Sequence, residues 1–196
     1  MINDTTNDTI AGEYYLTGMM EMASAFLLIP DGTFQFFFTY GALDRYGSGR
    51  WEINGDDLLL TSAAPPEADF TLVKSSKQDH DFIQVQMEDA DPLLMRHVYC
   101  SLDKGQEGTW HQLDHEGAIQ LQDRPVTDIS LLLEFCAERF STIPVSDPFH
   151  NDFTFRFNET IMEVFVKSLT LKVRGKELNG GHPLLQGNEF RYQKAR

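Results

Sequence analysis

Cysteine is scarce in this chain: Cys100 and Cys136 are its two cysteines among 196 residues. Two cysteines are too few for a disulfide scaffold, and these two lack the C-x-x-C spacing of zinc or redox sites. Both lie in apolar runs, which favours reduced thiols buried in a core. A single disulfide between them stays open for an exported protein.

Long apolar runs and a targeting segment are also missing. The longest apolar stretch covers residues 23–29, far below the roughly 20 residues that a membrane-spanning helix needs. We therefore expect no membrane insertion. Residues 1–10 have neither the basic start nor the apolar centre of a secretory signal. This favours a cytoplasmic protein, and export with the signal absent from this sequence is the alternative.

Basic residues are scarce: the chain has 16 Lys and Arg but 30 Asp and Glu, which gives a net charge of −14. A field of that sign repels phosphate backbones and anionic lipid headgroups, so we expect no nucleic acid as a partner. From Lys167 to Arg196 the balance reverses, with seven basic residues against Glu177 and Glu189. This stretch is either an edge hairpin protected by lysine or a patch for an anion or an acidic partner.

Short aromatic and aliphatic runs are abundant, and the chain holds 15 Phe. Turn-forming tripeptides separate these runs, such as Pro30-Asp31-Gly32 and Asn54-Gly55-Asp56, which is typical of antiparallel hairpins. We predict an all-β protein, with a small antiparallel meander or partial barrel at residues 10–76 followed by a β-sandwich at residues 80–196. The wholly polar residues 75–81 mark the boundary. Residues 136–142 also fit a short helix.

Two resemblances agree with this division. The short up-and-down strands of residues 12–62, together with Gly49-Arg50-Trp51, resemble a lipocalin-like (calycin) barrel. In the second domain, the alternating strand 82–87, the strand 98–102 and the turn at Asp114-His115-Glu116-Gly117-Ala118 look like a transthyretin-like or carboxypeptidase-regulatory-like β-sandwich. That second resemblance implies an accessory or adhesive module.

Motifs for nucleotides, metals and nucleophilic catalysis are missing. The chain has no G-x-G-x-x-G, Walker or G-x-S-x-G sequence. His111 and His115 flank Asp114, but such residues are typical of an exposed turn. The acidic run from Asp79 to Asp91 lacks the glycine and distal glutamate of a calcium-binding EF-hand. We therefore expect no metal and no cofactor.

Two carboxylates form the weak case for an enzyme. Glu21 lies among methionines, and Asp44 follows Tyr40-Gly41-Ala42-Leu43. A carboxylate in apolar surroundings acquires a raised pKa and can act as a general acid, with the second as base or nucleophile. A separation of about 5 to 9.5 Å would fit a glycosidase. The structural alternative pairs such a carboxylate with Arg45 or Arg50.

The segment from Phe34 to Tyr40 gives the stronger case for binding. Its even-numbered aromatics share one side of a strand and Phe37 takes the other, so the strand either lines a ligand site or fills a core. The candidate ligand contacts are Phe36, Tyr40, Arg50 and Trp51. We predict a non-enzymatic β protein that binds a protein or a small apolar ligand. The alternative is a hydrolase-like enzyme using Glu21 and Asp44.

Overall fold

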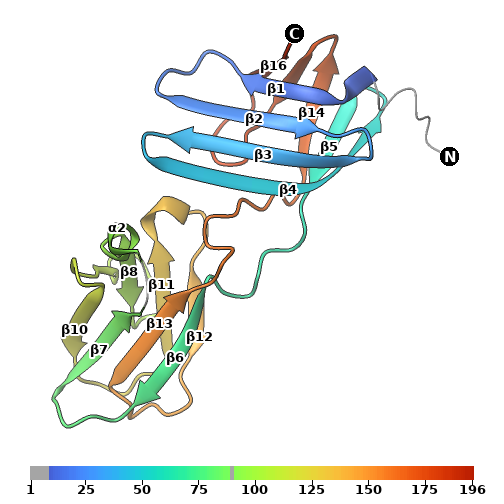
Figure 1. Cartoon of the computed structure of the whole chain (residues 1–196). Helices are drawn as coiled ribbons and strands as arrows, with labels where there is room; N and C mark the ends of the chain where they lie inside the picture. Colours follow the sequence, from blue (N-terminus) through green and yellow to red (C-terminus); the bar gives the residue numbers. More distant parts are fainter. Residues whose placement is uncertain (1–8, 89–90) are drawn as a thin grey trace. The chain divides into compact units, whose positions relative to one another are not determined.

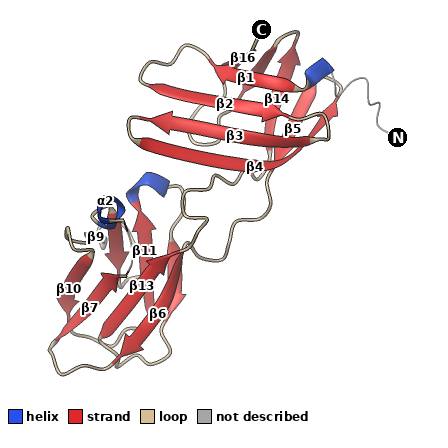
Figure 2. Cartoon of the chain, viewed as in Figure 1, coloured by secondary structure: helices blue, strands red, loops and turns tan. Residues whose placement is uncertain are grey.

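The chain divides into two compact units in the computed structural model, which describes residues 9–88 and 91–196 (Figure 1). We name residues up to Pro65 together with Met162–Arg196 the barrel, and Pro66–Ile161 the two-sheet unit. Strands dominate both units, as Figure 2 shows. The chain is all-β, which confirms the predicted fold class.

The barrel is a closed ring of antiparallel strands in which each strand pairs with the next barrel strand along the chain and β16 pairs with β1. The predicted turns at Gly32 and Gly55 have the positive φ that glycine tolerates. The eight strands are β1 (Gly12–Leu16), β2 (Met22–Leu28), β3 (Thr33–Tyr40), β4 (Leu43–Asn54), β5 (Asp57–Thr61), β14 (Leu169–Arg174), β15 (Glu177–Gly180) and β16 (Phe190–Lys194).

The last three barrel strands come from the end of the chain, which the sequence pattern places in the second domain. Leu169 of β14 pairs with Leu60 of β5, so the two-sheet unit is inserted between two neighbouring barrel strands. Residues 75–81 are therefore not a linker; they cover the end of β6 and the loop before β7. The ring is closed rather than partial, and β14 to β16 are paired on both sides, so the basic stretch is not an edge hairpin.

Side chains of β3 alternate between the inside and the outside of the barrel, as strand geometry requires. Phe34, Phe36 and Phe38 are at most 6% exposed, whereas Phe37 is 44% exposed. The strand is thus buried on one face. This single-face burial fixes the register of β3, because a slip by one residue would expose three phenylalanines.

A return segment, residues 162–166, completes the barrel wall beside β4. The Val164 amide donates to the Tyr46 carbonyl (2.7 Å), and Tyr46 forms a parallel bridge with Glu163. Val164 and Val166 join the barrel core. A Cβ atom at Gly47 would overlap the carbonyl oxygen of Val164, so glycine permits this close approach of the two backbones.

The two-sheet unit holds two four-stranded sheets, ordered β10-β7-β13-β6 and β12-β11-β8-β9. All neighbours are antiparallel except β7 and β13. Its elements are β6 (Phe70–Ser76), β7 (Phe82–Met87), α2 (Pro92–Met95), β8 (Val98–Ser101), β9 (His111–Gln112), β10 (Ala118–Gln122), β11 (Asp128–Leu133), η1 (Glu134–Cys136), β12 (Ser141–Pro144) and β13 (Asp152–Phe157). The predicted helix at residues 136–142 is reduced to the 3₁₀ turn η1, which ends at Cys136.

Both cysteines are buried in the two-sheet unit, as the sequence favoured. Burial raises the pKa of the Cys100 thiol to about 12, so this thiol stays protonated and unreactive at neutral pH.

The chain enters and leaves the two-sheet unit at adjacent points. Phe70 pairs with Phe157, and the Asn158 amide donates to the Asp69 carbonyl (2.9 Å).

Candidate binding face of the barrel

Side chains fill the inside of the barrel. The largest of those that are less than 2% exposed there are Tyr14, Phe26, Phe34, Leu28, Leu58, Leu60 and Tyr192. The interior of an eight-stranded barrel is just wide enough for its own side chains to occupy. Phe36 is 2% exposed, and Trp51, which is 3% exposed, donates through Nε1 to the Ile29 carbonyl (2.9 Å). These two predicted ligand contacts therefore belong to the core.

His182, in the loop between β15 and β16, is buried among the aromatic rings of the barrel. Its Nδ1 accepts hydrogen bonds from the amides of Leu184 (3.0 Å) and Leu185 (3.1 Å). Because Nδ1 is an acceptor, Nε2 carries the ring proton and donates it to the Ser24 Oγ (3.0 Å). The Ser24 hydroxyl donates to the Phe37 carbonyl (3.1 Å).

This chain of hydrogen bonds is structural. A histidine that donates to a serine hydroxyl cannot also remove its proton, so Ser24 and His182 do not form a nucleophile–base pair in this arrangement. Burial lowers the pKa of His182 to about 4, which keeps the ring neutral at pH 7. The imidazole instead fastens its loop to the inner wall of β2.

The two predicted catalytic carboxylates are both exposed. Glu21 lies in the loop between β1 and β2, with a φ of 68°, and Asp44 lies near the start of β4. The apolar surroundings that a general acid of this kind requires are absent at both positions. Arg45 is buried and donates to the backbone carbonyls of Met162 (3.4 Å) and Glu163 (3.3 Å).

Tyr40 and Arg50, the remaining predicted ligand contacts, are exposed at opposite ends of the β3–β4 hairpin. Tyr40 pairs with Leu43 next to the turn, and Arg50 pairs with Thr33 at the far end. Arg50 lines a groove of about 560 Å³ together with residues of β3, β4 and β5. The four predicted contacts therefore do not converge on one site.

A different set of aromatic residues does converge, on the outer surface of β1 to β4. Tyr15 pairs with Ala25, Ala25 with Phe37, and Phe37 with Tyr46. These four residues form one cross-strand line, which we name the aromatic row. Its three rings are 44 to 54% exposed. Aromatic side chains exposed side by side on a sheet are typical of recognition surfaces.

A groove of about 530 Å³ runs over the aromatic row. The next cross-strand line, Glu13, Leu27, Gln35 and Ser48, forms its other wall. The small Ala25 separates the rings of Tyr15 and Phe37 and so leaves space between them. The groove thus combines apolar ring faces with polar groups along one side, the composition of many binding sites.

The phenol of Tyr15 is tied to the carboxylate beside it. Its hydroxyl donates to Glu13 Oε2 (2.8 Å), and this hydrogen bond and the charge of Glu13 raise the Tyr15 pKa. Glu13 and Tyr15 are two residues apart on β1 and both are exposed, so their side chains lie on the same face. The hydrogen bond orients the ring at one end of the groove.

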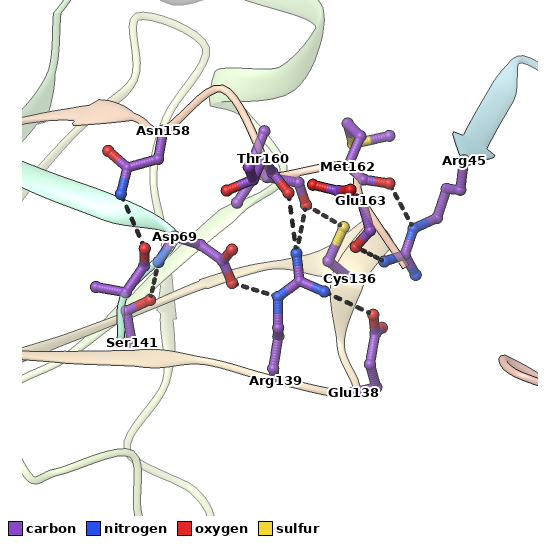
Figure 3. A network of polar contacts seen from close by, with 12 residues as sticks. Arg45, Asp69, Cys136, Glu138, Arg139, Ser141, Asn158, Thr160, Met162 and Glu163 are labelled. Carbon is purple, nitrogen blue, oxygen red and sulfur yellow. Dashed lines mark hydrogen bonds and ion pairs between the residues drawn. The ribbon is translucent and has the colours of Figure 1, made fainter. Parts of the chain in front are cut away.

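Other clusters of polar residues have structural roles. In the two-sheet unit, Arg139 forms an ion pair with Asp69 (2.6 Å) and donates to the Thr160 carbonyl (3.2 Å), as Figure 3 shows. It also donates to the Ile161 carbonyl (3.0 Å). Asp114, from the histidine-flanked turn, accepts from the amides of Glu116 and Ala118. Within residues 9–88 and 91–196, no three His, Cys, Asp or Glu side chains are grouped to hold a metal ion. Asp89 of the acidic run is outside these residues.

Comparisons with protein-family models, with curated proteins and with solved structures found no match. In the described part of the chain, no helix has the length and apolar character needed to cross a membrane. The aromatic row therefore has to be interpreted from its own chemistry.

The sequence-based interpretation left Tyr15 and Phe37 out of the candidate site and did not align Tyr46 with them. Alternation along β3 indicated that Phe37 faces away from its neighbours. Nothing local to the sequence aligns it with Tyr15 and Tyr46, because the pairing of β1 to β4 sets that register.

Proposed function

We propose that this protein is a non-catalytic binding module that holds its ligand on the aromatic row. The observation that carries the proposal is the contrast between the two faces of the wall formed by β1 to β4. The inner face is packed with buried rings, and the outer face presents Tyr15, Phe37 and Tyr46 in one register.

The closed up-and-down ring supports a lipocalin-like relationship for the barrel. Barrels of this kind often hold one small ligand inside. Here Tyr14, Phe26 and Tyr192 occupy that space, which favours the outer face as the binding surface. A wall several strands wide with exposed tyrosines suits a protein partner, since tyrosine supplies a large, rigid, amphipathic contact.

A peptide library tests this proposal because selection from random sequences needs no named partner. Random 12-residue peptides displayed on phage are selected on the full-length protein, and each enriched peptide is synthesised for calorimetry. The test variant carries Tyr15→Ser, Phe37→Ser and Tyr46→Ser. The matched control carries Leu93→Ser, Phe140→Ser and Phe149→Ser, which remove exposed apolar groups from the two-sheet unit.

We expect the enriched peptides to bind the wild type and the control equally, and to bind the test variant at least tenfold more weakly. Circular dichroism and melting temperature establish that all three proteins are folded. The proposal would be overturned by peptides that bind the test variant as tightly as the wild type. It would also be overturned if the selection enriched no peptide whose binding depends on the three rings.

A further inference from the structure

The charge around the aromatic row is one-sided. Glu13 is the charged member of the groove lining. Asp44 is exposed on the neighbouring line, where it pairs with Thr39. Of the basic residues in β1 to β4, Arg45 is buried and Arg50 lies at the far end of the β3–β4 hairpin. A ligand that covers the row therefore meets carboxylates, and a cationic ligand is the complement.

Each terminal tyrosine of the row has a carboxylate two residues before it, and the two carboxylates lie on opposite sides of the row because β1 and β4 run in opposite directions. Glu13 precedes Tyr15 by two residues on β1, and Asp44 precedes Tyr46 by two residues on β4. All four are exposed, so each carboxylate shares the outer face with its tyrosine. A cation over either phenol ring gains attraction from the ring face and from the adjacent carboxylate.

The distance between the two acidic tyrosine pairs indicates the size of the ligand. β1 and β4 are separated by β2 and β3, and neighbouring strands lie about 4.8 Å apart, so Tyr15 and Tyr46 are about 14 Å apart along the curved outer wall of the barrel. A single small organic cation cannot contact both pairs. An extended polypeptide advances about 3.4 Å per residue, so residues i and i+4 span about 14 Å and project to the same side.

We propose that the aromatic row binds an extended basic segment of another protein, with Lys or Arg side chains four residues apart stacked on Tyr15 and Tyr46. This inference rests on the proposed function and names the partner chemistry of the same site. The apolar middle of the segment covers Phe37 and Ala25. A second copy of the chain is a poor occupant because two molecules of charge −14 repel each other.

Two capped peptides test the inference on the full-length protein. The probe is acetyl-Arg-Thr-Val-Thr-Arg-amide, and its neutral match replaces both Arg by Gln. Binding is followed by two-dimensional NMR titration at 50 and 300 mM NaCl. One variant carries Glu13→Gln and Asp44→Asn. Its control, Glu67→Gln with Glu107→Gln, removes the same charge from exposed positions of the two-sheet unit.

We expect the Arg peptide to shift resonances of β1, β3 and β4, and to bind about two- to thirtyfold more weakly to the Glu13→Gln, Asp44→Asn variant, the range for losing two exposed ion pairs. The Glu67, Glu107 control should bind within twofold of the wild type, and the Gln peptide should bind more weakly than the Arg peptide. Equal binding of the Arg and Gln peptides, or equal losses in both charge variants, would overturn the inference.

Failure of the basic-partner inference can be distinguished from failure of the proposed binding face. Library peptides that are neutral but still depend on Tyr15, Phe37 and Tyr46 would leave the binding face standing and remove the basic partner. Arg-peptide shifts confined to the two-sheet unit, whose residues 66–161 hold 18 acidic and 7 basic side chains, would also remove it.

Discussion

The imidazole of His182 donates from Nε2 to the hydroxyl of Ser24 at 3.0 Å, which joins the loop between β15 and β16 to the inner face of β2. Both ring nitrogens are used in the neutral form, since Nδ1 accepts from two backbone amides. A second ring proton would face those two donors. The loop is therefore held by a bond pattern that requires an uncharged histidine.

This predicts an acid-sensitive barrel. The pKa of His182 is lowered from 6.5 to about 4 in the folded chain, so the unfolded chain takes up the proton first as the pH falls. The free energy of unfolding should be unaffected by this group above pH 7 and should fall from about pH 6.5 to 4, by about 3 kcal/mol in total. Urea unfolding at pH 7.5, 5.5 and 4.5 measures it.

Comparison with two variants isolates the contribution of this residue. His182→Gln retains a donor and an acceptor but does not titrate, so its loss of stability between pH 7.5 and 4.5 should be smaller than that of the wild type. His115→Gln removes an exposed histidine and should keep the wild-type slope. Parallel slopes for His182→Gln and the wild type would show that His182 does not set the acid sensitivity.

Phe36 and Phe37 are neighbours in sequence but should differ sharply in stability. Phe36→Ala removes a ring that is 2% exposed and should cost about 3 to 5 kcal/mol. Phe37→Ala should cost less than about 1.5 kcal/mol, because its ring is 44% exposed. Trp51 fluorescence in a Trp110→Phe background reports barrel unfolding, since each unit contains one tryptophan. Large, equal losses would mean that the outer ring is buried in the native protein.

Removing only the cation of the Arg139–Asp69 ion pair should destabilise the two-sheet unit more than removing both charges. Arg139→Met leaves the buried Asp69 carboxylate without its cation, which typically costs about 3 to 5 kcal/mol. Adding Asp69→Asn removes the orphaned charge, so the double variant should recover part of the loss. Trp110 fluorescence in a Trp51→Phe background follows the two-sheet unit. A double variant less stable than Arg139→Met would contradict this explanation.

Gly47 should not tolerate a side chain, because the return segment lies against it. Gly47→Ala places a Cβ against the Val164 carbonyl, which has to move, so we expect a loss of about 2 kcal/mol or more. Gly41→Ala meets no atom within 4 Å but has a φ of 60°, so it should cost about 1 kcal/mol. The two midpoints in urea are compared by Trp51 fluorescence. A Gly47→Ala protein as stable as the wild type would show that the wall can widen there.

The fold class was predictable because its signals are local. The strand at Thr33–Tyr40 and the turn at Gly55 depend on neighbouring residues, and both appear in the structure where the sequence predicts them. The closure of the barrel was not predictable in this way. Leu60 and Leu169 pair across an insertion of about a hundred residues. No change of composition near Leu60 or near Leu169 indicates that their two strands pair.

The candidate site was likewise predictable only where it depends on local sequence. The sequence identified an aromatic strand but could not decide which face was core, so it selected Phe36 and Trp51, which are buried. The outer row requires the register of four strands, since Tyr15 and Tyr46 meet Phe37 only through pairing. The sequence around each tyrosine does not show that Tyr15 and Tyr46 lie in one cross-strand line, because that line exists only once the four strands have paired.

Hydroxyl-radical footprinting of the protein with and without its tightest library-selected peptide tests the binding face most directly. We predict that the peptide lowers oxidation of Tyr15, Phe37 and Tyr46 severalfold and leaves Leu93, Phe140 and Phe149 unchanged. Protection confined to the latter three residues, or unchanged oxidation of the aromatic row in a saturated complex, would contradict the assignment of the barrel's outer surface as the site of binding.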